Sequence, residues 1–299
     1  MADKEILERY KTGDIRALSR MISLVENEIP GWEKLIEELD LSGDPIITGI
    51  TGPPGAGKST LINALIDEIG SEAKISILAV DPSSPFNRGS VLGDRLRMSE
   101  HFNDSNVYIR SLATRGALGG LSNKIYEVLD VLRGAGFDYI LIETVGVGQS
   151  EVEIASMANT TVLVLVPESG DEVQTLKSGI MEIADIIVVN KSDREGADKM
   201  IGSVTTSLHD KAPTKWTVPV LKTTASLKKG IPELLKHIKE HKEHKTSDVK
   251  VKLLVNQASR ILVNRCLSKI DQNKLQEKIS SDFGKDGFNI YSTLRDFEK

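Results

Sequence analysis

A glycine-rich stretch that ends in a lysine and a serine is the first part of the chain whose spacing predicts chemistry. It reads G-x-x-x-x-G-K-S, follows the apolar run 46–50 and precedes an apolar, helix-like stretch that begins at Leu61. Glycines allow successive backbone N–H groups to turn inward around phosphate oxygens, and the positive end of a following helix faces the same anion. We expect Lys58 to reach the β- and γ-phosphates of a nucleotide and the Ser59 hydroxyl to ligate Mg²⁺. The predicted phosphate-binding residues are Gly52, Pro53, Pro54, Gly55, Ala56, Gly57, Lys58, Ser59 and Thr60.

A second motif, N-K-x-D, directly follows the apolar run 186–189 and suits recognition of guanine. An ionised aspartate only accepts hydrogen bonds, so Asp193 can take the N1–H and 2-amino protons of guanine together, whereas adenine offers neither donor there. The stem of Lys191 can lie over the base, and Asn190 can tie this loop to the phosphate loop. The alternative is that the motif only caps a helix. A further loop, formed by Thr224, Ala225 and Ser226, is expected to offer a backbone N–H to the guanine O6.

Three acidic residues are candidates for binding Mg²⁺ or its water ligands. Asp81 and Glu143 each end an apolar run, and Asp94 lies in a loop rich in glycine, serine and proline. Gly146 follows Glu143 at the spacing of a γ-phosphate-sensing glycine, so its N–H can bond the γ-phosphate. Each acid could instead only cap a loop.

The residue that orients the attacking water is less evident. Ras-like switches place glutamine directly after the sensing glycine, but this chain has Val147 there and Gln149 two positions later. We therefore expect slow intrinsic hydrolysis, with Lys58, Asp94, Glu143 and Gln149 as the catalytic candidates. Three nearby arginines could stabilise transferred charge or could be ordinary surface residues: Arg88, Arg95 and Arg97.

The sequence between these motifs predicts the scaffold that brings them together. Short runs rich in β-branched residues follow residue 45, and helix-like stretches lie between most of them. Near-continuous apolar runs that alternate with helices are typical of a parallel sheet buried on both faces. We expect an α/β fold, a P-loop NTPase whose mostly parallel central sheet is flanked by helices. The predicted strands are residues 46–51, 75–80, 107–110, 139–142, 161–166, 186–189 and 218–221.

Helical stretches flank this core at both ends. Leu18, Met21, Ile22 and Val25 have the spacing of one helix face. The terminal helices could cover the core or could pair with another subunit, and the residues favour neither. The expected organisation is an N-terminal helical extension over residues 1–43, a P-loop GTPase domain over 44–240 and a C-terminal helical extension over 241–299.

The composition excludes several classes of protein. Among 299 residues, 38 Lys and Arg face 43 Asp and Glu, and aromatic residues make up 4%. This balance argues against a chain that coats nucleic acid or an anionic membrane. Cys266, the single cysteine, excludes an internal disulfide and a cysteine-rich metal site. The charged N-terminus lacks a signal-peptide core and no apolar run is long enough to span a bilayer, so we expect a cytoplasmic protein.

Three histidines, His237, His241 and His244, share the spacing of one helix face and could hold a metal. Their neighbours are lysines and glutamates, however, so we expect a solvated helix face at this position.

Six motifs occur in the order found in one known family, and they cover roughly residues 10–240. On these motifs the chain resembles the MeaB/ArgK (MMAA-type) family of chaperone GTPases. They are Gly52–Thr60 and residues 79–86, 89–95, 143–151, 168–172 with the stretch after it, and 190–193.

This resemblance implies a homodimeric, Mg²⁺-dependent enzyme that hydrolyses GTP to GDP and phosphate. It implies a partner, an adenosylcobalamin-dependent acyl-CoA mutase such as methylmalonyl-CoA mutase, whose cobalamin loading and protection the GTPase gates. It also implies that Asp81, Asp94 and Glu143 act around the metal, that residues 170–177 form a switch at the partner surface and that 241–299 is the dimerisation region. The alternatives are an ATPase or kinase linked to lysine, arginine and ornithine transport, which Asp193 disfavours, and a metallochaperone GTPase, which usually carries a Cys/His cluster.

Overall fold

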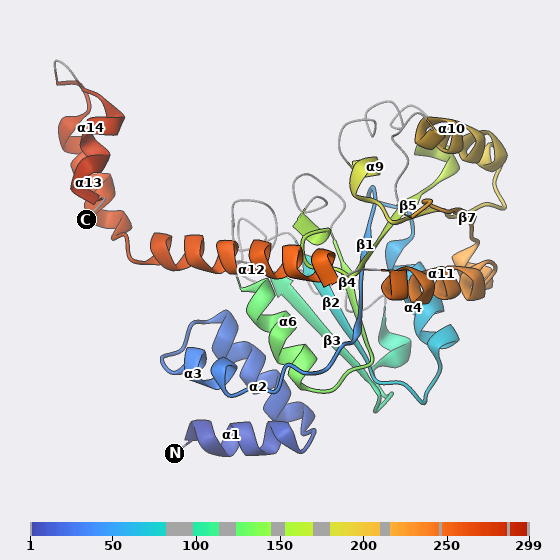
Figure 1. Cartoon of the computed structure of the whole chain (residues 1–299), viewed down its shortest axis with the longest axis horizontal. Coiled ribbons are helices and arrows are strands. Elements are labelled where there is room, and N and C mark those ends of the chain that lie inside the picture. Colours follow the sequence, from blue (N-terminus) through green and yellow to red (C-terminus); the bar gives the residue numbers. More distant parts are fainter. Residues whose placement is uncertain are drawn as a thin grey trace. The chain divides into compact units, whose positions relative to one another are not determined.

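A computed structural model of the chain describes residues 2–81, 98–113, 124–144, 153–169, 180–209, 216–244, 247–285 and 288–297. Its centre is a parallel sheet of seven strands in the order β3-β2-β4-β1-β5-β6-β7 (Figure 1). Each of the seven predicted runs coincides with one strand, which confirms the predicted α/β fold. The strands are β1 Ile46–Thr51, β2 Ile75–Asp81, β3 Val107–Ala113, β4 Tyr139–Glu143, β5 Thr160–Leu165, β6 Ile186–Val189 and β7 Val220–Lys222.

The order in which strands are added to the sheet reverses at β1: β2 to β4 lie on one side of it and β5 to β7 on the other. Strand β1 pairs with β4 on one side and with β5 on the other, although β2 follows it in sequence. Ile50, near the carboxyl end of β1, lies opposite Glu143 of β4 and Val162 of β5. In open parallel sheets such a reversal leaves a crevice beyond the carboxyl ends of the strands, where ligands bind. The loop after β1 is the predicted phosphate-binding loop.

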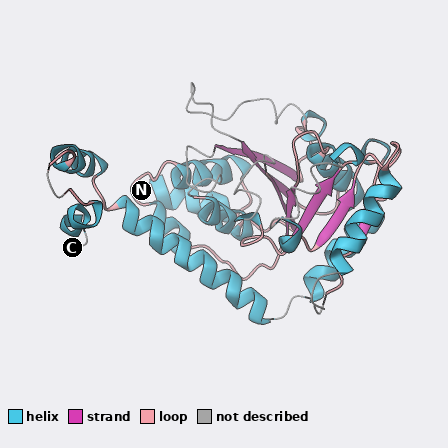
Figure 2. Cartoon of the chain, turned by 90° about the horizontal axis from the view of Figure 1, so that it is seen from above, coloured by secondary structure: helices cyan, strands magenta, loops and turns pink. Residues whose placement is uncertain are grey.

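Helices cover both faces of the sheet (Figure 2). Alternate residues of β4 show this: Ile140 and Ile142 belong to the apolar cluster that contains α2 and α6, and Leu141 to the cluster that contains α4 and α11. Burial on both faces explains why the strands read as continuous apolar runs rather than as alternating ones. The helices of this core are α4 Lys58–Ile69, α6 Ile125–Gly134, α9 Ile180–Ile183, α10 Ala197–His209 and α11 Ile231–His244.

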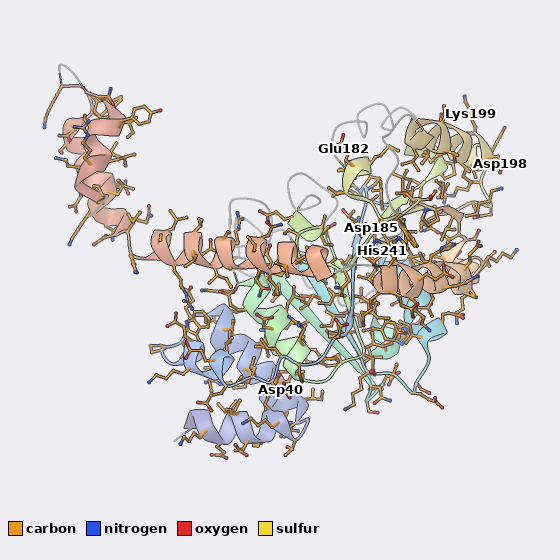
Figure 3. The ribbon with its side chains drawn as sticks, viewed as in Figure 1. Asp40, Glu182, Asp185, Asp198, Lys199 and His241 are labelled. Carbon is orange, nitrogen blue, oxygen red and sulfur yellow. The ribbon has the colours of Figure 1, made fainter. Side chains whose placement is uncertain are left out.

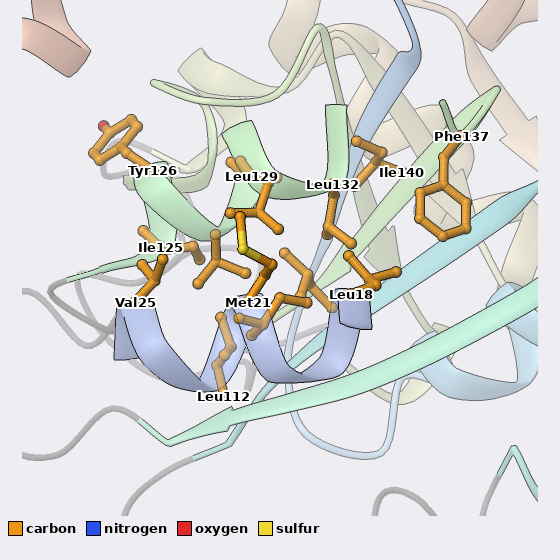
Figure 4. Packing of buried hydrophobic residues seen from close by; sticks show 14 of the residues in the cluster. Leu18, Met21, Val25, Leu112, Ile125, Tyr126, Leu129, Leu132, Phe137 and Ile140 are labelled. Atoms are coloured by element: carbon orange, nitrogen blue, oxygen red, sulfur yellow. The ribbon is translucent and has the colours of Figure 1, made fainter. Parts of the chain in front are cut away.

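The N-terminal extension is helical, as predicted, and covers the core. Asp14 caps α2, because its carboxylate accepts the N–H groups of residues 16 and 17 at 2.8 and 3.1 Å. The predicted apolar face is buried, with Met21, Ile22 and Val25 all 0% exposed. Figure 4 shows Met21 and Leu129 packed between α2 and α6. The extension comprises α1 Ala2–Lys11, α2 Ile15–Glu26 and α3 Trp32–Glu37.

The chain divides into two compact units, Met1–Lys250 and Val251–Lys299. The second unit is helical, as the sequence predicts. Asp271 caps α13 by accepting the N–H groups of residues 273 and 274, and the rings of Phe283 and Phe288 lie 5.7 Å apart. Among the described helices, none combines the length and the apolar character that a bilayer crossing requires. The remaining helices are α12 Ser247–Ser268, which begins in the first unit, α13 Gln272–Asp282 and α14 Ile290–Leu294.

Candidate nucleotide-binding site

The glycines of the phosphate-binding loop occupy positions that only glycine fits. Gly52, Gly55 and Gly57 have φ angles of 141°, 78° and 87°, which side-chain-bearing residues rarely adopt. A Cβ on Gly52 would lie 2.1 Å from the carbonyl oxygen of Val164, and a Cβ on Gly57 would lie 2.5 Å from Nδ2 of Asn190. The loop therefore passes close to β5 and to the N-K-x-D motif before α4 begins at Lys58.

Lys58 is folded back over this loop. Its Nζ donates to the carbonyl oxygens of Gly52 at 2.8 Å and Pro53 at 3.2 Å, and the residue is 6% exposed. The ammonium group is thus held at the mouth of the loop, at the N-terminus of α4. Hydrogen bonds between an ammonium and phosphate oxygens are stronger than those to neutral carbonyls, so a phosphate in the loop can take over these bonds.

Ser59 and Glu143 meet at the adjoining strand ends. The Ser59 hydroxyl donates to Oε1 of Glu143 at 2.7 Å, and both residues are 7% exposed. Thr144 fixes the end of β4, since its hydroxyl donates to the hydroxyl of Thr51 at 3.0 Å. A hydroxyl and a carboxylate are hard oxygen ligands of the kind that Mg²⁺ prefers. The predicted pair Ser59 and Glu143 therefore fits a Mg²⁺ site.

Asp81, the other predicted acid that the structure describes, closes β2. The backbone of β2 pairs with β4 so that Ala79 lies opposite Glu143. Asp81 is therefore at the same carboxyl edge of the sheet, two residues beyond that pairing; its side chain is not among those described. The other predicted contributors lie outside the described residues. These are Asp94, Gly146 and Gln149, together with Arg88, Arg95, Arg97 and the predicted switch 170–177.

Asn190 joins three loops. The sequence predicts its link between the N-K-x-D loop and the phosphate loop; its link to the loop after β7 is an addition. Its Nδ2 donates to the carbonyl oxygen of Ala56 at 2.9 Å. Its Oδ1 accepts the hydroxyl of Thr223 and the N–H of Ala225, each at 3.1 Å. The side chain is 2% exposed and uses both ends of its amide. The phosphate loop, the N-K-x-D loop and the loop after β7 are thus held in one fixed arrangement.

Lys191 and Asp193 belong to the N-K-x-D loop that Asn190 holds in place. Lys191 has a φ of 53°, and its Nζ donates to the carbonyl oxygen of Gly55 at 2.8 Å. Its aliphatic stem therefore runs from the N-K-x-D loop to the phosphate loop, the position expected of a side chain that lies over a base. The side chain of Asp193 is exposed, so its carboxylate is accessible to a ligand from solvent.

The backbone N–H groups of the loop after β7 are partly engaged within the protein. The N–H of Ala225 is used by Asn190, and Ala225 is 4% exposed. Ser226 is exposed. Of the three residues predicted to offer a backbone N–H to a guanine O6, Thr224 and Ala225 thus have theirs engaged within the protein, and Ser226 is the remaining candidate.

The sequence analysis missed Thr223, and it named Glu168 only as part of the motif 168–172 without a role of its own. Thr223 is 1% exposed, and besides its bond to Asn190 its carbonyl oxygen accepts the N–H of Ser192 at 3.0 Å. Glu168 pairs with Arg194, whose guanidinium holds the pKa of the Glu168 carboxyl below its usual range. Glu168 lies in a short helical turn, η2 Pro167–Ser169, that ends just before the predicted switch 170–177. Arg194 directly follows Asp193. The N-K-x-D motif and the family motif at residues 168–172 both pointed toward this region.

The predicted solvated histidine face is wrong for His241. This residue is 4% exposed; its Nδ1 lies 3.0 Å from the Thr160 hydroxyl and its Nε2 lies 3.3 Å from Oδ1 of Asp185 (Figure 3). Its ring also lies 4.8 Å from that of Trp216. α11 turns this position toward the amino ends of β5 and β6, so burial overrides the polar neighbours in sequence. Within the described residues, no group of three histidine, cysteine or acidic side chains is arranged to hold a metal.

Comparisons with known proteins agree with this geometry. A family model described as methylmalonyl Co-A mutase-associated GTPase MeaB matches residues 18–282. A Pyrococcus abyssi protein named as a GTPase is 51% identical over 245 residues, which are 80% of this chain and 76% of that protein. The mouse methylmalonic aciduria type A homolog, mitochondrial, is 42% identical over 217 residues, 64% of this chain and 52% of that protein. The crystal structure of a LAO/AO transport system kinase, 24% identical, has the same fold, with a TM-score of 0.65 over 99% of this chain and 96% of that one. The length of the family match and the sequence identities show that the chain is a P-loop GTPase and belongs to the MeaB family of methylmalonyl-CoA mutase-associated GTPases.

Proposed function

We propose that this GTPase binds GTP with Mg²⁺ and that hydrolysis changes its affinity for an adenosylcobalamin-dependent acyl-CoA mutase such as methylmalonyl-CoA mutase. In this role it gates cobalamin loading and protects the mutase. The observation that carries the nucleotide part is the side chain of Asn190, which binds Ala56 of the phosphate loop and Ala225 of the loop after β7 at the same time. The membership of a mutase-associated family supports the partner.

Recognition of guanine rests on four side-chain or backbone groups. The exposed carboxylate of Asp193 accepts the N1–H and 2-amino protons, and the stem of Lys191 covers one face of the base. Asn190 keeps this loop at a fixed distance from the phosphates. The N–H of Ser226 faces the O6 atom. Adenine would place its amino group against that donor and would leave the carboxylate without protons to accept, so the site selects against ATP.

Hydrolysis proceeds by attack of water on the γ-phosphate, whose bond to the bridging oxygen breaks to leave GDP and phosphate. Lys58 transfers its hydrogen bonds from the loop carbonyls to the phosphate oxygens and offsets the charge that develops there. Ser59 and Glu143 hold Mg²⁺, with Asp81 and Asp94 as further ligands of the metal or its waters. Bound Mg²⁺ supplies charge neutralisation at the phosphate oxygens. Gly146 senses the γ-phosphate and Gln149 orients the water.

Two regions would pass the nucleotide state to other chains. Residues 170–177 form the switch that the mutase contacts. The turn that precedes them in sequence contains Glu168, whose ion pair with Arg194 joins that turn to the base-recognition loop. The C-terminal extension, residues 241–299, pairs with the same region of a second copy to form a homodimer. Support for that pairing comes from apolar side chains of α12 that are each about half exposed or more: Val251, Leu254, Val255, Leu262, Val263 and Leu267.

Two measurements on the purified protein test the proposal. Displacement of a fluorescent GDP by GTP and by ATP should show at least a hundredfold preference for GTP, and equal affinities would contradict guanine recognition and favour the transport-linked ATPase. Co-elution with purified methylmalonyl-CoA mutase should differ between GDP and a non-hydrolysable GTP analogue. A mutase interaction that is absent with every nucleotide, in a protein that still binds GTP, would contradict the proposed partner alone.

A further inference from the structure

A second cavity lies at the end of the sheet opposite to the nucleotide loops, where the N-terminal extension meets the core. It encloses about 500 Å³ of empty space when its open mouth is included. Its walls come from the α1–α2 turn, the start of α2, the residues before β2 and β3, and the end of α6. A six-residue strand spans about 20 Å, so the length of β1 separates this cavity from the phosphate loop.

The floor of the cavity is aromatic and apolar. Tyr108 and Phe137 form it, with ring centroids 6.1 Å apart and exposures of 7% and 8%. Tyr10 and Leu18, 4% and 3% exposed, complete the apolar wall. The Tyr10 hydroxyl donates to the carbonyl oxygen of residue 131 at 2.6 Å, and the Tyr108 hydroxyl pairs with that of residue 19 at 3.2 Å. Because both hydroxyls have partners in the protein, the rings present carbon to a ligand.

Two charged residues at the rim of the cavity, Asp14 and Lys74, differ in how far protein groups already pair with their charges. The carboxylate of Asp14 caps α2 and pairs with Arg9 at 2.7 Å, and Arg9 holds the pKa of that carboxyl below its usual range. Asp14 is therefore already neutralised by protein groups. The backbone N–H of Lys74 donates to Asp138 at 2.8 Å, whereas among the described residues the Lys74 ammonium makes no hydrogen bond or ion pair. Ser105 adds an exposed hydroxyl to the same rim.

From this combination we infer that the cavity binds a small organic anion: an aromatic or branched aliphatic body on Tyr108 and Phe137, with a carboxylate or similar group at Lys74. A recessed apolar floor with a few polar groups at the mouth is the usual composition of a small-molecule site. Nothing in this assignment depends on the nucleotide or on the mutase. A bound ligand would contact both α2 and the core, so it would also hold the N-terminal extension against the sheet.

The test uses the full chain and a simple probe, 4-fluorobenzoate, followed by ¹⁹F NMR line broadening. A ligand of this size should bind with a dissociation constant below about 10 mM. 4-Fluorobenzyl alcohol has the same body without the charge and should bind up to about fivefold more weakly, the upper end of the range of an exposed ion pair. 4-Fluorobenzylamine should bind more weakly still. Excess GDP should not displace the benzoate, which distinguishes this cavity from the nucleotide site.

Matched variants assign the binding to the cavity. Lys74→Met should remove the preference for the acid over the alcohol, whereas Lys74→Arg and a distant control, Lys199→Met on α10, should retain it. Ala135→Leu and Ile15→Trp, which fill the cavity from two sides, should abolish binding of both probes. GDP binding of each variant checks that it is folded.

Three results would overturn the inference. They are the absence of saturable binding by the parent protein, equal affinity for the acid and the alcohol, and undiminished binding by both folded cavity-filling variants.

Discussion

The hydroxyl of Ser59 donates to the carboxylate of Glu143 across 2.7 Å, although the two residues are 84 positions apart. Ser59 stands in the first turn of α4, after the phosphate loop, and Glu143 is the last residue of β4. Their meeting follows from the pairing of β1 with β4, which sets Ile50 opposite Glu143. The contact joins the start of α4 to the end of β4, although strands β2 and β3 and helix α6 lie between them in sequence. Both side chains carry oxygen ligands and are buried.

Glu143→Gln tests whether this pair holds the metal. The amide keeps the size of the side chain but loses the charge that favours a divalent cation. We expect GTP turnover to fall by about 100- to 1,000-fold, with a higher Mg²⁺ concentration needed for half-maximal rate. Steady-state phosphate release over a Mg²⁺ titration measures both. Glu37→Gln, on an exposed part of α3, is the control, and a Glu143→Gln enzyme that matches it would exclude the metal role.

Asp193→Asn tests base recognition. The amide can no longer accept two protons from guanine, and losing two charge-assisted hydrogen bonds should weaken GDP binding about 100-fold. Xanthine carries an oxygen where guanine has its 2-amino group, so the same variant should bind XDP better than GDP. Competition titrations give both affinities. Asp198→Asn, on the exposed side of α10, should change neither, and unchanged GDP affinity in Asp193→Asn would refute the assignment.

Asn190→Ala tests whether this side chain holds the phosphate loop, the N-K-x-D loop and the loop after β7 together. The substitution leaves the hydroxyl of Thr223 and the N–H of Ala225 without their buried acceptor, at a cost of about 1–3 kcal/mol in the free energy of unfolding. We also expect weaker GDP binding, because the base loop is no longer held at the phosphate loop. Denaturant unfolding and GDP titration check the two effects.

Thr223→Val provides the graded comparison for that experiment. It removes one donor to Asn190. The bond that Asn190 donates to Ala56 and the bond that it accepts from the N–H of Ala225 stay intact. It should therefore lower the stability less than Asn190→Ala and change GDP affinity little. A larger effect of Thr223→Val on GDP affinity would show that the link between these loops does not depend on Asn190.

Glu127 on α6 makes the stability depend on pH. It is 5% exposed, and among the residues that the structure describes its Oε2 has no hydrogen-bond partner. Lys124, 3.5 Å from Oε1, is shared with Glu28. Burial raises the pKa of the Glu127 carboxyl above its ordinary 4.5. The folded state therefore binds this proton more tightly than the unfolded state, so the free energy of unfolding falls as pH rises from about 4.5 through the raised pKa.

The substitution Glu127→Gln should remove the fall in the free energy of unfolding that ionisation of this carboxyl causes. The melting temperature of the variant relative to the parent protein should be higher at pH 7.5 than at pH 4.5, because only the parent carries a buried carboxylate at the higher pH. Thermal melts at several pH values measure the difference. Glu68→Gln, exposed on α4, should show no such trend. A difference that is constant with pH in Glu127→Gln would mean that the carboxyl does not titrate in this range.

Local sequence determined the elements and the two nucleotide motifs. Strand β5 is buried at all six positions and apolar at the last four, because both faces of a parallel strand are buried. Gly52 and Gly57 are glycines because the loop needs left-handed backbone and close approach to Val164 and Asn190. Such requirements act on single residues or on short repeats, so they leave a pattern that can be read without the fold.

Contacts between residues far apart in sequence were decided by the tertiary structure. Thr223 carries no motif, and its role follows only from the meeting of β6 and β7. His241 lies among charged neighbours, yet α11 packs so that this position faces Thr160 and Asp185. The α2 face could have met another subunit, but it is buried on α6. The spacing of apolar residues along a helix shows that one face is buried, but it does not show which part of the protein covers that face. Any apolar surface of matching shape offers the same free energy of transfer from water.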